Sequence, residues 1–403
     1  MRKKDKQIKR RDALKWIAVS GAAAFLGRST LVSPVFARDQ NIDQTVRIGA
    51  LIPLSGNADA YARQMRLGID TAVAEINGSG GVLGRKIAVE YRDSETTPAV
   101  LPERCQELID EWGAIALIGP WAAAGRKYAA RFLSDRNIPL VNASNHAGGF
   151  CSPVLFSLGP TTSQDGHALV RYLDEAEQIK DYFMLGSYPS WQNTMFRQLR
   201  LPMYQRGHHV HGQALTATGE RQFRPIIRWI QETNTASVLF CVMRKHGQEF
   251  LHQASELGLL NKLTVGWIGF NDALVDGLTP EELERIVTTS PFVASDPEGG
   301  VPDFVARVRS QHGSNTPIGY HALTHYNAVK ALQAAWEKSG EVSAAAALTG
   351  LRGLKFESPT GPVSIDAENQ HATMPIVVAR GSKNGLQLVK RLGPIDPDPG
   401  CSI

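Results

Sequence analysis

The stretch Val46–Pro98, VRIGALIPLSGNADAYARQMRLGIDTAVAEINGSGGVLGRKIAVEYRDSETTP, decides the fold of this chain. It opens with a short apolar run, Val46–Pro53, which has the length and composition of a strand buried on both faces. Apolar residues then recur at helical spacing until a glycine-rich turn, where the chain can adopt positive φ most easily. Ile87–Tyr91 follows as a second strand, with Asp93 at its carboxyl end. We therefore predict a strand, a helix and a strand joined by short turns.

The same alternation continues through most of the chain, and a second series of strands and helices begins near residue 161. Short connections between such elements predict open parallel sheets of the α/β class. We expect two similar open parallel-sheet lobes joined by a hinge, with Phe356–Arg391 as a terminal β hairpin region. The predicted boundaries are 46–160 plus 291–355 for lobe 1, 161–290 plus 356–393 for lobe 2, and 394–403 for a flexible tail.

Composition excludes several classes of protein. The chain has 403 residues, of which 43% are apolar and 20% charged, which is ordinary for a globular protein of two domains. Its net charge of +4 includes a strongly basic amino terminus, so the remainder is close to neutral and nothing indicates a nucleic-acid partner. No later segment has 18 consecutive apolar residues, and we expect a soluble mature chain.

Residues 1–37 read as an export signal. The pair Arg10 and Arg11 precedes an apolar stretch, Trp16–Leu26, and Val35–Ala37 supplies the small residues that a signal peptidase accepts. This pattern resembles a twin-arginine signal cleaved after Ala37; the alternative is an ordinary secretory signal that contains Arg-Arg. Both place the mature protein in the periplasm.

The four cysteines would meet an oxidising compartment there. Their spacing matches no metal or redox motif, and two arrangements stay open: a disulfide between Cys105 and Cys151, or free buried thiols. Cys241 offers no pattern, and Cys401 lies in a Pro- and Asp-rich tail that we expect to be loose.

Several linked segments resemble one known family. Ile52–Gly56, the region of Tyr61, Glu75–Asn77 with the glycines after it, and Asp93 followed by Pro98 are together similar to the leucine/isoleucine/valine-binding proteins, the type I periplasmic binding proteins of ABC importers. The resemblance covers nearly all of the mature chain. It implies a hinged two-lobed clamp that binds a small solute, an ABC permease as partner, a monomer, no cofactor and no enzymatic activity.

A narrower resemblance points to the branch that binds urea and short-chain amides. It rests on Ile118–Trp121 with Arg126 and Lys127, on Cys151–Pro153, and on Phe356–Val363. Arg126 and Lys127 open a helix, where we favour a solvated or salt-bridged role over ligand contact.

Ligands of open parallel sheets bind outside the carboxyl ends of the strands, so the candidate site residues are taken from those ends. Aromatic residues there could form flat apolar walls, although each ring could equally be core packing. The candidates are Tyr61, Trp121, Ala122, Ala123, Asn142, Ser144, His146, Trp191 and Phe270.

The same positions argue against an amino-acid ligand. Amino-acid binders of the resembled family use a Ser-rich turn for the carboxylate, and here that turn is Ala122–Gly125. Their ammonium-binding acid would fall near Ile268 and Gly269, where no acid stands, and Ser187 and Trp191 replace their Asp and Tyr. Because a buried ammonium needs a carboxylate partner, a neutral or differently charged ligand is favoured.

Other functions have weaker support. No Gly-rich phosphate loop, Ser nucleophile elbow or metal-ligand cluster indicates an enzyme, and the histidines at 208, 209, 211, 321 and 325 lack a recognised metal pattern. We therefore expect an exported substrate-binding protein of an ABC importer for urea, a short-chain amide or an amino-acid-like solute. The alternatives are a periplasmic ligand sensor of the same fold and a branched-chain amino-acid-binding protein.

Overall fold

The first sheet confirms the predicted α/β alternation. The computed structural model describes residues 45–95, 97–186, 189–217 and 219–403, together with their side chains except those of 57, 189 and 190. Five parallel strands lie in the order β2-β1-β3-β4-β5. They are β1 (Thr45–Ile52), β2 (Lys86–Asp93), β3 (Ala116–Ile118), β4 (Leu140–Asn142) and β5 (Leu155–Ser157).

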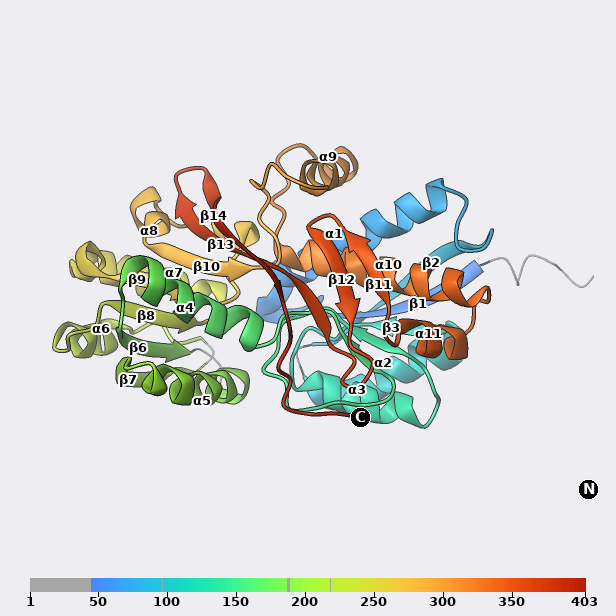
Figure 1. Ribbon diagram of the computed structural model, residues 1–403, viewed down its shortest axis with the longest axis horizontal. Coiled ribbons are helices and arrows are strands. Elements are labelled where there is room, and N and C mark those ends of the chain that lie inside the picture. The colour runs from blue at the N-terminus through green and yellow to red at the C-terminus, as the bar shows by residue number, and fades with distance from the viewer. Residues whose placement is uncertain (1–44, 96, 187–188, 218) are drawn as a thin grey trace, which may run out of the picture. The chain divides into compact units, whose positions relative to one another are not determined.

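The second sheet has a parallel part and an antiparallel part, and its path is β11-β12-β13-β10-β9-β8-β6-β7, with β14 paired to β13. Figure 1 shows the long β13 and β14 ribbons beside β10. Strands β6 to β10 pair parallel with one another, whereas β13 pairs antiparallel with β10 and the strands after residue 354 pair antiparallel among themselves, which confirms the terminal hairpin region. The strands are β6 (Asp181–Gly186), β7 (His209–Leu215), β8 (Ser237–Cys241), β9 (Thr264–Trp267), β10 (Ile286–Ser290), β11 (Lys355–Ser358), β12 (Gly361–Ile365), β13 (Ala372–Ser382) and β14 (Gly385–Ile395).

Helices connect these strands, as the short turns of the sequence predict. The α-helices are α1 (Asp59–Gly78), α2 (Leu101–Gln106), α3 (Gly125–Ser134), α4 (Ala168–Glu177), α5 (Pro189–Gln205), α6 (Arg224–Gln231), α7 (Arg244–Glu256), α8 (Pro280–Glu284), α9 (Val301–His312), α10 (Tyr320–Ser339) and α11 (Ala344–Leu351). The shorter turns are η2 (Gly56–Ala58), η3 (Pro98–Val100), η4 (Glu107–Glu111), η5 (Ser163–His167), η6 (Leu259–Lys262) and η7 (Asp272–Leu274).

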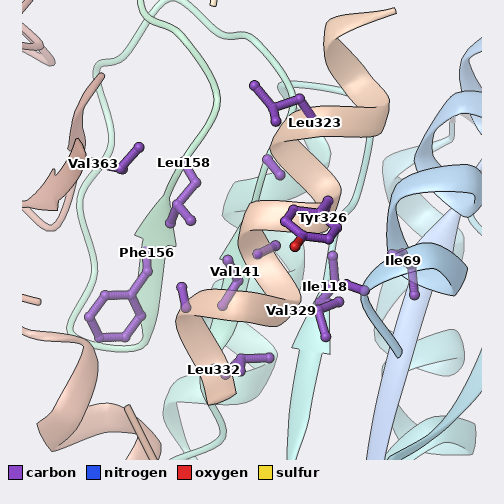
Figure 2. Packing of buried hydrophobic residues seen from close by; sticks show 14 of the residues in the cluster. Ile69, Ile118, Val141, Phe156, Leu158, Leu323, Tyr326, Val329, Leu332 and Val363 are labelled. Atoms are coloured by element: carbon purple, nitrogen blue, oxygen red, sulfur yellow. The ribbon is translucent and has the colours of Figure 1, made fainter. Parts of the chain in front are cut away.

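Helix α10 returns to the first sheet from far along the chain. Figure 2 shows its apolar side chains between strand residues and α1, in one cluster of buried hydrophobic residues. A Cβ built on Gly68 would lie 2.0 Å from the Ala322 carbonyl oxygen, so only glycine permits this approach of α1 to α10. The buried Gln64 side chain adds two hydrogen bonds, to the Pro317 carbonyl (2.8 Å) and from the Gly319 N–H (2.7 Å). These contacts fix where α10 begins.

The carboxyl-terminal tail is tied down, contrary to the expectation of a loose tail. Cys401 forms a disulfide with Cys151, and the Gly149 N–H donates to the Pro399 carbonyl at 2.7 Å. The possible Cys105–Cys151 pairing is wrong, because Cys105 lies in α2 and is a fully buried free thiol. Cys241 is also free and buried. Strand β14 carries the tail back toward the loop after β4, which the cysteine spacing alone could not reveal.

Arg10, Arg11, Ala37 and Ser187 lie outside the described residues. Among the residues that are described, no helix is both long and apolar enough to cross a membrane.

The disulfide predicts a measurable loss of stability when either partner is removed. Cys401→Ser should lower the free energy of unfolding by about 2–5 kcal/mol, because the bond closes a long loop in the unfolded chain. Thermal or denaturant unfolding measures the change. Cys151→Ser should cost as much, and the double variant no more than either one. A double variant with the summed cost would contradict the pairing.

Candidate ligand-binding site

A cavity of about 520 Å³ lies at the carboxyl ends of strands from both sheets. Its walls come from the turns after β1, β2, β3, β4, β8 and β9 and from the first turns of α1, α5 and α10, as expected for ligand sites of open parallel sheets. The lining residues are Gly56, Ala58, Tyr61, Thr97, Pro98, Trp121, Ala122, Ala123, Ala124, Asn145, Trp191, Gln192, Val242, Met243, Ile268, Gly269, Tyr320 and His321.

Aromatic rings form a continuous part of this lining. The Tyr61 ring centroid lies 5.0 Å from that of Trp121 and 5.4 Å from that of His321, whose ring stacks on Tyr320 at 4.1 Å. Burial raises the pKa of the Tyr61 phenol to about 12, opposed by a hydrogen bond from the Arg244 backbone N–H. The wall is therefore neutral at physiological pH and suits a flat apolar surface on a ligand.

Polar atoms on the same lining have no hydrogen-bond partner within the described part of the chain. They are Nε1 of Trp191, Oε1 of Gln192, Oη of Tyr320 and both ring nitrogens of His321. Burial, and then the neighbouring His325, hold the pKa of His321 well below its usual range, so the imidazole is neutral and offers one donor and one acceptor. Buried polar groups are normally paired, so these atoms are suited to bind a polar ligand.

The lining carries no charged side chain: within the described residues, no Asp, Glu, Lys or Arg contributes to the cavity wall. The turn Ala122–Ala124 directly precedes α3, a helix of ten residues, so its free backbone N–H groups and the helix dipole favour a negative or polar group there.

A buried acid stands behind this wall. Asp165 in η5 is 2% exposed, accepts a hydrogen bond from the Asn145 side chain, and leaves Oδ2 without a partner among the described residues. Burial raises the pKa of its carboxyl to about 8, against the lowering effect of Asn145. Gly269 lets Asn145 approach, because a Cβ there would lie 3.2 Å from Asn145 Nδ2. Asp165 thus holds the one amide side chain that reaches the cavity from the turn after β4.

Five of the predicted site residues line the cavity: Tyr61, Trp121, Ala122, Ala123 and Trp191. The other four lie behind its wall. Asn142 Nδ2 donates to the Pro120 carbonyl (2.7 Å), Ser144 is buried, His146 Nδ1 accepts from the Gly148 N–H (3.0 Å), and Phe270 packs on Trp267 at 4.8 Å.

Sequence reasoning missed the contribution of α10. Tyr320 and His321 open a helix that is mostly buried, so its sequence is typical of a core-packing helix. Their position on the cavity depends on a long-range return of the chain that no local pattern announces. The weaker histidine candidates face carboxylates instead: His208 Nε2 lies 3.0 Å from Asp174, and His211 Nε2 lies 2.7 Å from Asp181.

Comparison with known proteins identifies the family. The family model described as periplasmic binding protein matches residues 45–386. The chain belongs to the periplasmic binding protein family. It is a binding protein and not an enzyme.

Proteins similar to this chain are named for, or were solved with, different ligands. Leu/Ile/Val-binding protein homolog 6 of Brucella suis is 23% identical over 92% of this chain and 94% of its own length. A solute-binding protein from Rhodopseudomonas palustris, solved with 3,4-dihydroxybenzoic acid, is 20% identical with a TM-score of 0.78, covering 89% of this chain and 99% of that one. LivJ of Streptococcus pneumoniae, solved with isoleucine, is 18% identical with a TM-score of 0.76, covering 86% and 99%. These two structures share the fold.

The buried Asp165 predicts a pH-dependent difference in stability. Its carboxyl pKa rises from 3.8 to about 8 on folding, so its contribution to stability is fully present below pH 4 and is lost as the pH rises toward 8. The side chain of the Asp165→Asn variant cannot ionise. The Tm of the variant, relative to that of the wild type, should therefore increase as the pH rises from 4 to 8. Thermal unfolding at several pH values tests this, with Asp303→Asn on the exposed side of α9 as the control. A Tm difference independent of pH would contradict the burial of an ionisable acid.

Proposed function

We propose that this protein captures a planar aromatic solute with a single carboxylate or carboxamide head group and delivers it to an ABC permease. The observation that carries the proposal is the cavity lining, whose described residues combine aromatic rings and unpaired polar atoms and include no charged side chain. Rings stack favourably on flat ligands, while Trp191, Gln192 and His321 can pair with a polar head.

An α-amino acid fits this lining less well. Its ammonium group would be buried without a carboxylate partner, which costs more than the remaining contacts recover. A carboxylate or carboxamide could instead meet the backbone N–H groups at the start of α3. The aromatic-acid ligand of the Rhodopseudomonas palustris neighbour supports this assignment, and the isoleucine ligand of LivJ represents the alternative.

The size of the cavity bears on the choice between an aromatic compound and urea or a short-chain amide. About 520 Å³ lies within the range of pockets that hold drug-sized ligands. An amide head suits the same polar atoms in either case. A four-atom ligand such as urea would leave the Tyr61–Trp121 surface uncovered, so the larger solute is the better match.

Capture works through contacts with both lobes. We assign the first sheet to lobe 1 and the second to lobe 2, so the lining residues Trp121 and Trp191 belong to different lobes. A ligand that touches both stabilises the conformation in which the two walls are close, and its binding energy shifts the population toward that state. We place the mature monomer in the periplasm, exported by the signal around Arg10 and Arg11 and cleaved after Ala37.

The proposal predicts which compounds stabilise the protein. Benzoate and benzamide should raise the Tm in a thermal-shift screen, because only a ligand that binds the folded state does so. Leucine and urea at equal concentration should change it little. Stabilisation by leucine alone would contradict the proposal and favour a branched-chain amino-acid-binding protein, while urea alone would favour the short-amide branch.

Variants locate the bound compound in the cavity. Trp191→Phe keeps an aromatic ring but removes the unpaired N–H, and should weaken binding of the stabilising compound roughly 3- to 10-fold. His321→Ala should weaken it at least as much. Trp229→Phe makes the same chemical change on α6, where the ring is 42% exposed and outside the cavity lining, and should leave the affinity unchanged. Equal affinities in all three variants would remove the site from this cavity.

A further inference from the structure

Arg126 is a buried cation without an anionic partner in the part of the chain that the structure describes. It is the second residue of α3 and is 2% exposed, so the expected solvated or salt-bridged role is wrong. Its Nη2 donates to the Gly148 carbonyl at 3.3 Å, and its Nε and Nη1 have no partner among the described residues. No carboxylate of the described chain lies within ion-pair distance of it. An unpaired charge in such a place is strongly unfavourable unless something compensates it.

Two buried histidines adjoin this guanidinium. His146 and His371 are 0% and 1% exposed, and their ring centroids are 5.2 Å apart. Burial and then the charge of Arg126 lower the pKa of His146, and both also lower that of His371 to about 4. Both rings are therefore neutral, which leaves Arg126 as the only positive charge of the group.

The hydrogen bonds fix what His146 can offer. Its Nδ1 accepts from the Gly148 N–H at 3.0 Å, so the proton of the neutral ring is on Nε2. That Nε2–H also has no partner among the described residues. Arg126 and His146 thus both carry unpaired N–H donors in one buried group of side chains, and among the described residues no carboxylate pairs with that group.

We propose that Arg126 and His146 bind a small monovalent anion of chloride size, with the His371 ring closing the site. The cover over it supports a small ion rather than an organic acid. The Gly149 N–H donates to the Pro399 carbonyl, and the Cys151–Cys401 disulfide joins the carboxyl-terminal tail to the same loop after β4. The site is separate from the solute cavity and does not rest on the proposed function.

The anion has a structural consequence for the cavity. Arg126 follows the turn Ala122–Ala124, and His146 follows Asn145. The two segments that form the cavity wall after β3 and β4 would therefore each supply one ligand to the ion. Neutralising the Arg126 charge there stabilises the fold of these two segments.

Halide-dependent stability tests the site. The Tm of the exported protein should rise by a few degrees, and saturate, when sodium chloride or bromide replaces sodium gluconate at constant ionic strength. Arg126→Met should abolish this halide dependence. Lys127→Met removes the same charge from the next residue, which is exposed, and should retain it.

A crystal of the wild-type protein grown in bromide keeps the test independent of whether Arg126→Met folds. An anomalous peak within hydrogen-bond distance of Arg126 and His146 is the expected result. Ordered water alone at this position, together with equal stability in chloride and gluconate, would overturn the proposal.

Discussion

The close contact between α1 and α10 is the constraint on which the binding cavity depends. The two helices lie so close at Gly68 that a Cβ there would clash with the Ala322 carbonyl. Gln64 fixes the residues just before α10 by two hydrogen bonds. Because α10 begins at Tyr320, this contact sets the position of Tyr320 and His321 on the cavity. The side chains of Tyr320 and His321, which can bind a ligand, are therefore positioned by core contacts with α1 residues that lie more than 250 residues earlier in the sequence.

Local patterns predict much of the fold for a physical reason. The buried strand Val46–Pro53, the helix after it and the strand with Asp93 at its end are encoded by spacing and by turn residues, and the structure contains each of them. The terminal hairpins could also be anticipated. Ligands bind at the carboxyl ends of parallel strands, and this rule correctly predicts that Tyr61, Trp121 and Trp191 line the cavity.

Long-range geometry explains what local patterns could not predict. The Cys151–Cys401 bond spans 250 residues, and it depends on where β14 leaves the tail. Arg126 reads as a surface residue beside Lys127, yet it is buried and donates to the Gly148 carbonyl, in a loop to which the tail is hydrogen-bonded. Side chains directly after β4 alternate between the cavity and the wall behind it, so Asn145 reaches the cavity while Ser144 and His146 do not.

We infer that the uncharged aromatic lining excludes the ammonium group of an amino acid. Calorimetric titration with 3-phenylpropanoate and with phenylalanine tests it most directly, since the two share a carbon skeleton and a carboxylate and differ in the α-ammonium. The lining predicts that 3-phenylpropanoate binds at least about tenfold tighter, the equivalent of one unpaired buried polar group. Phenylalanine binding as tightly as 3-phenylpropanoate, or more tightly, would show that the lining does not exclude the ammonium group.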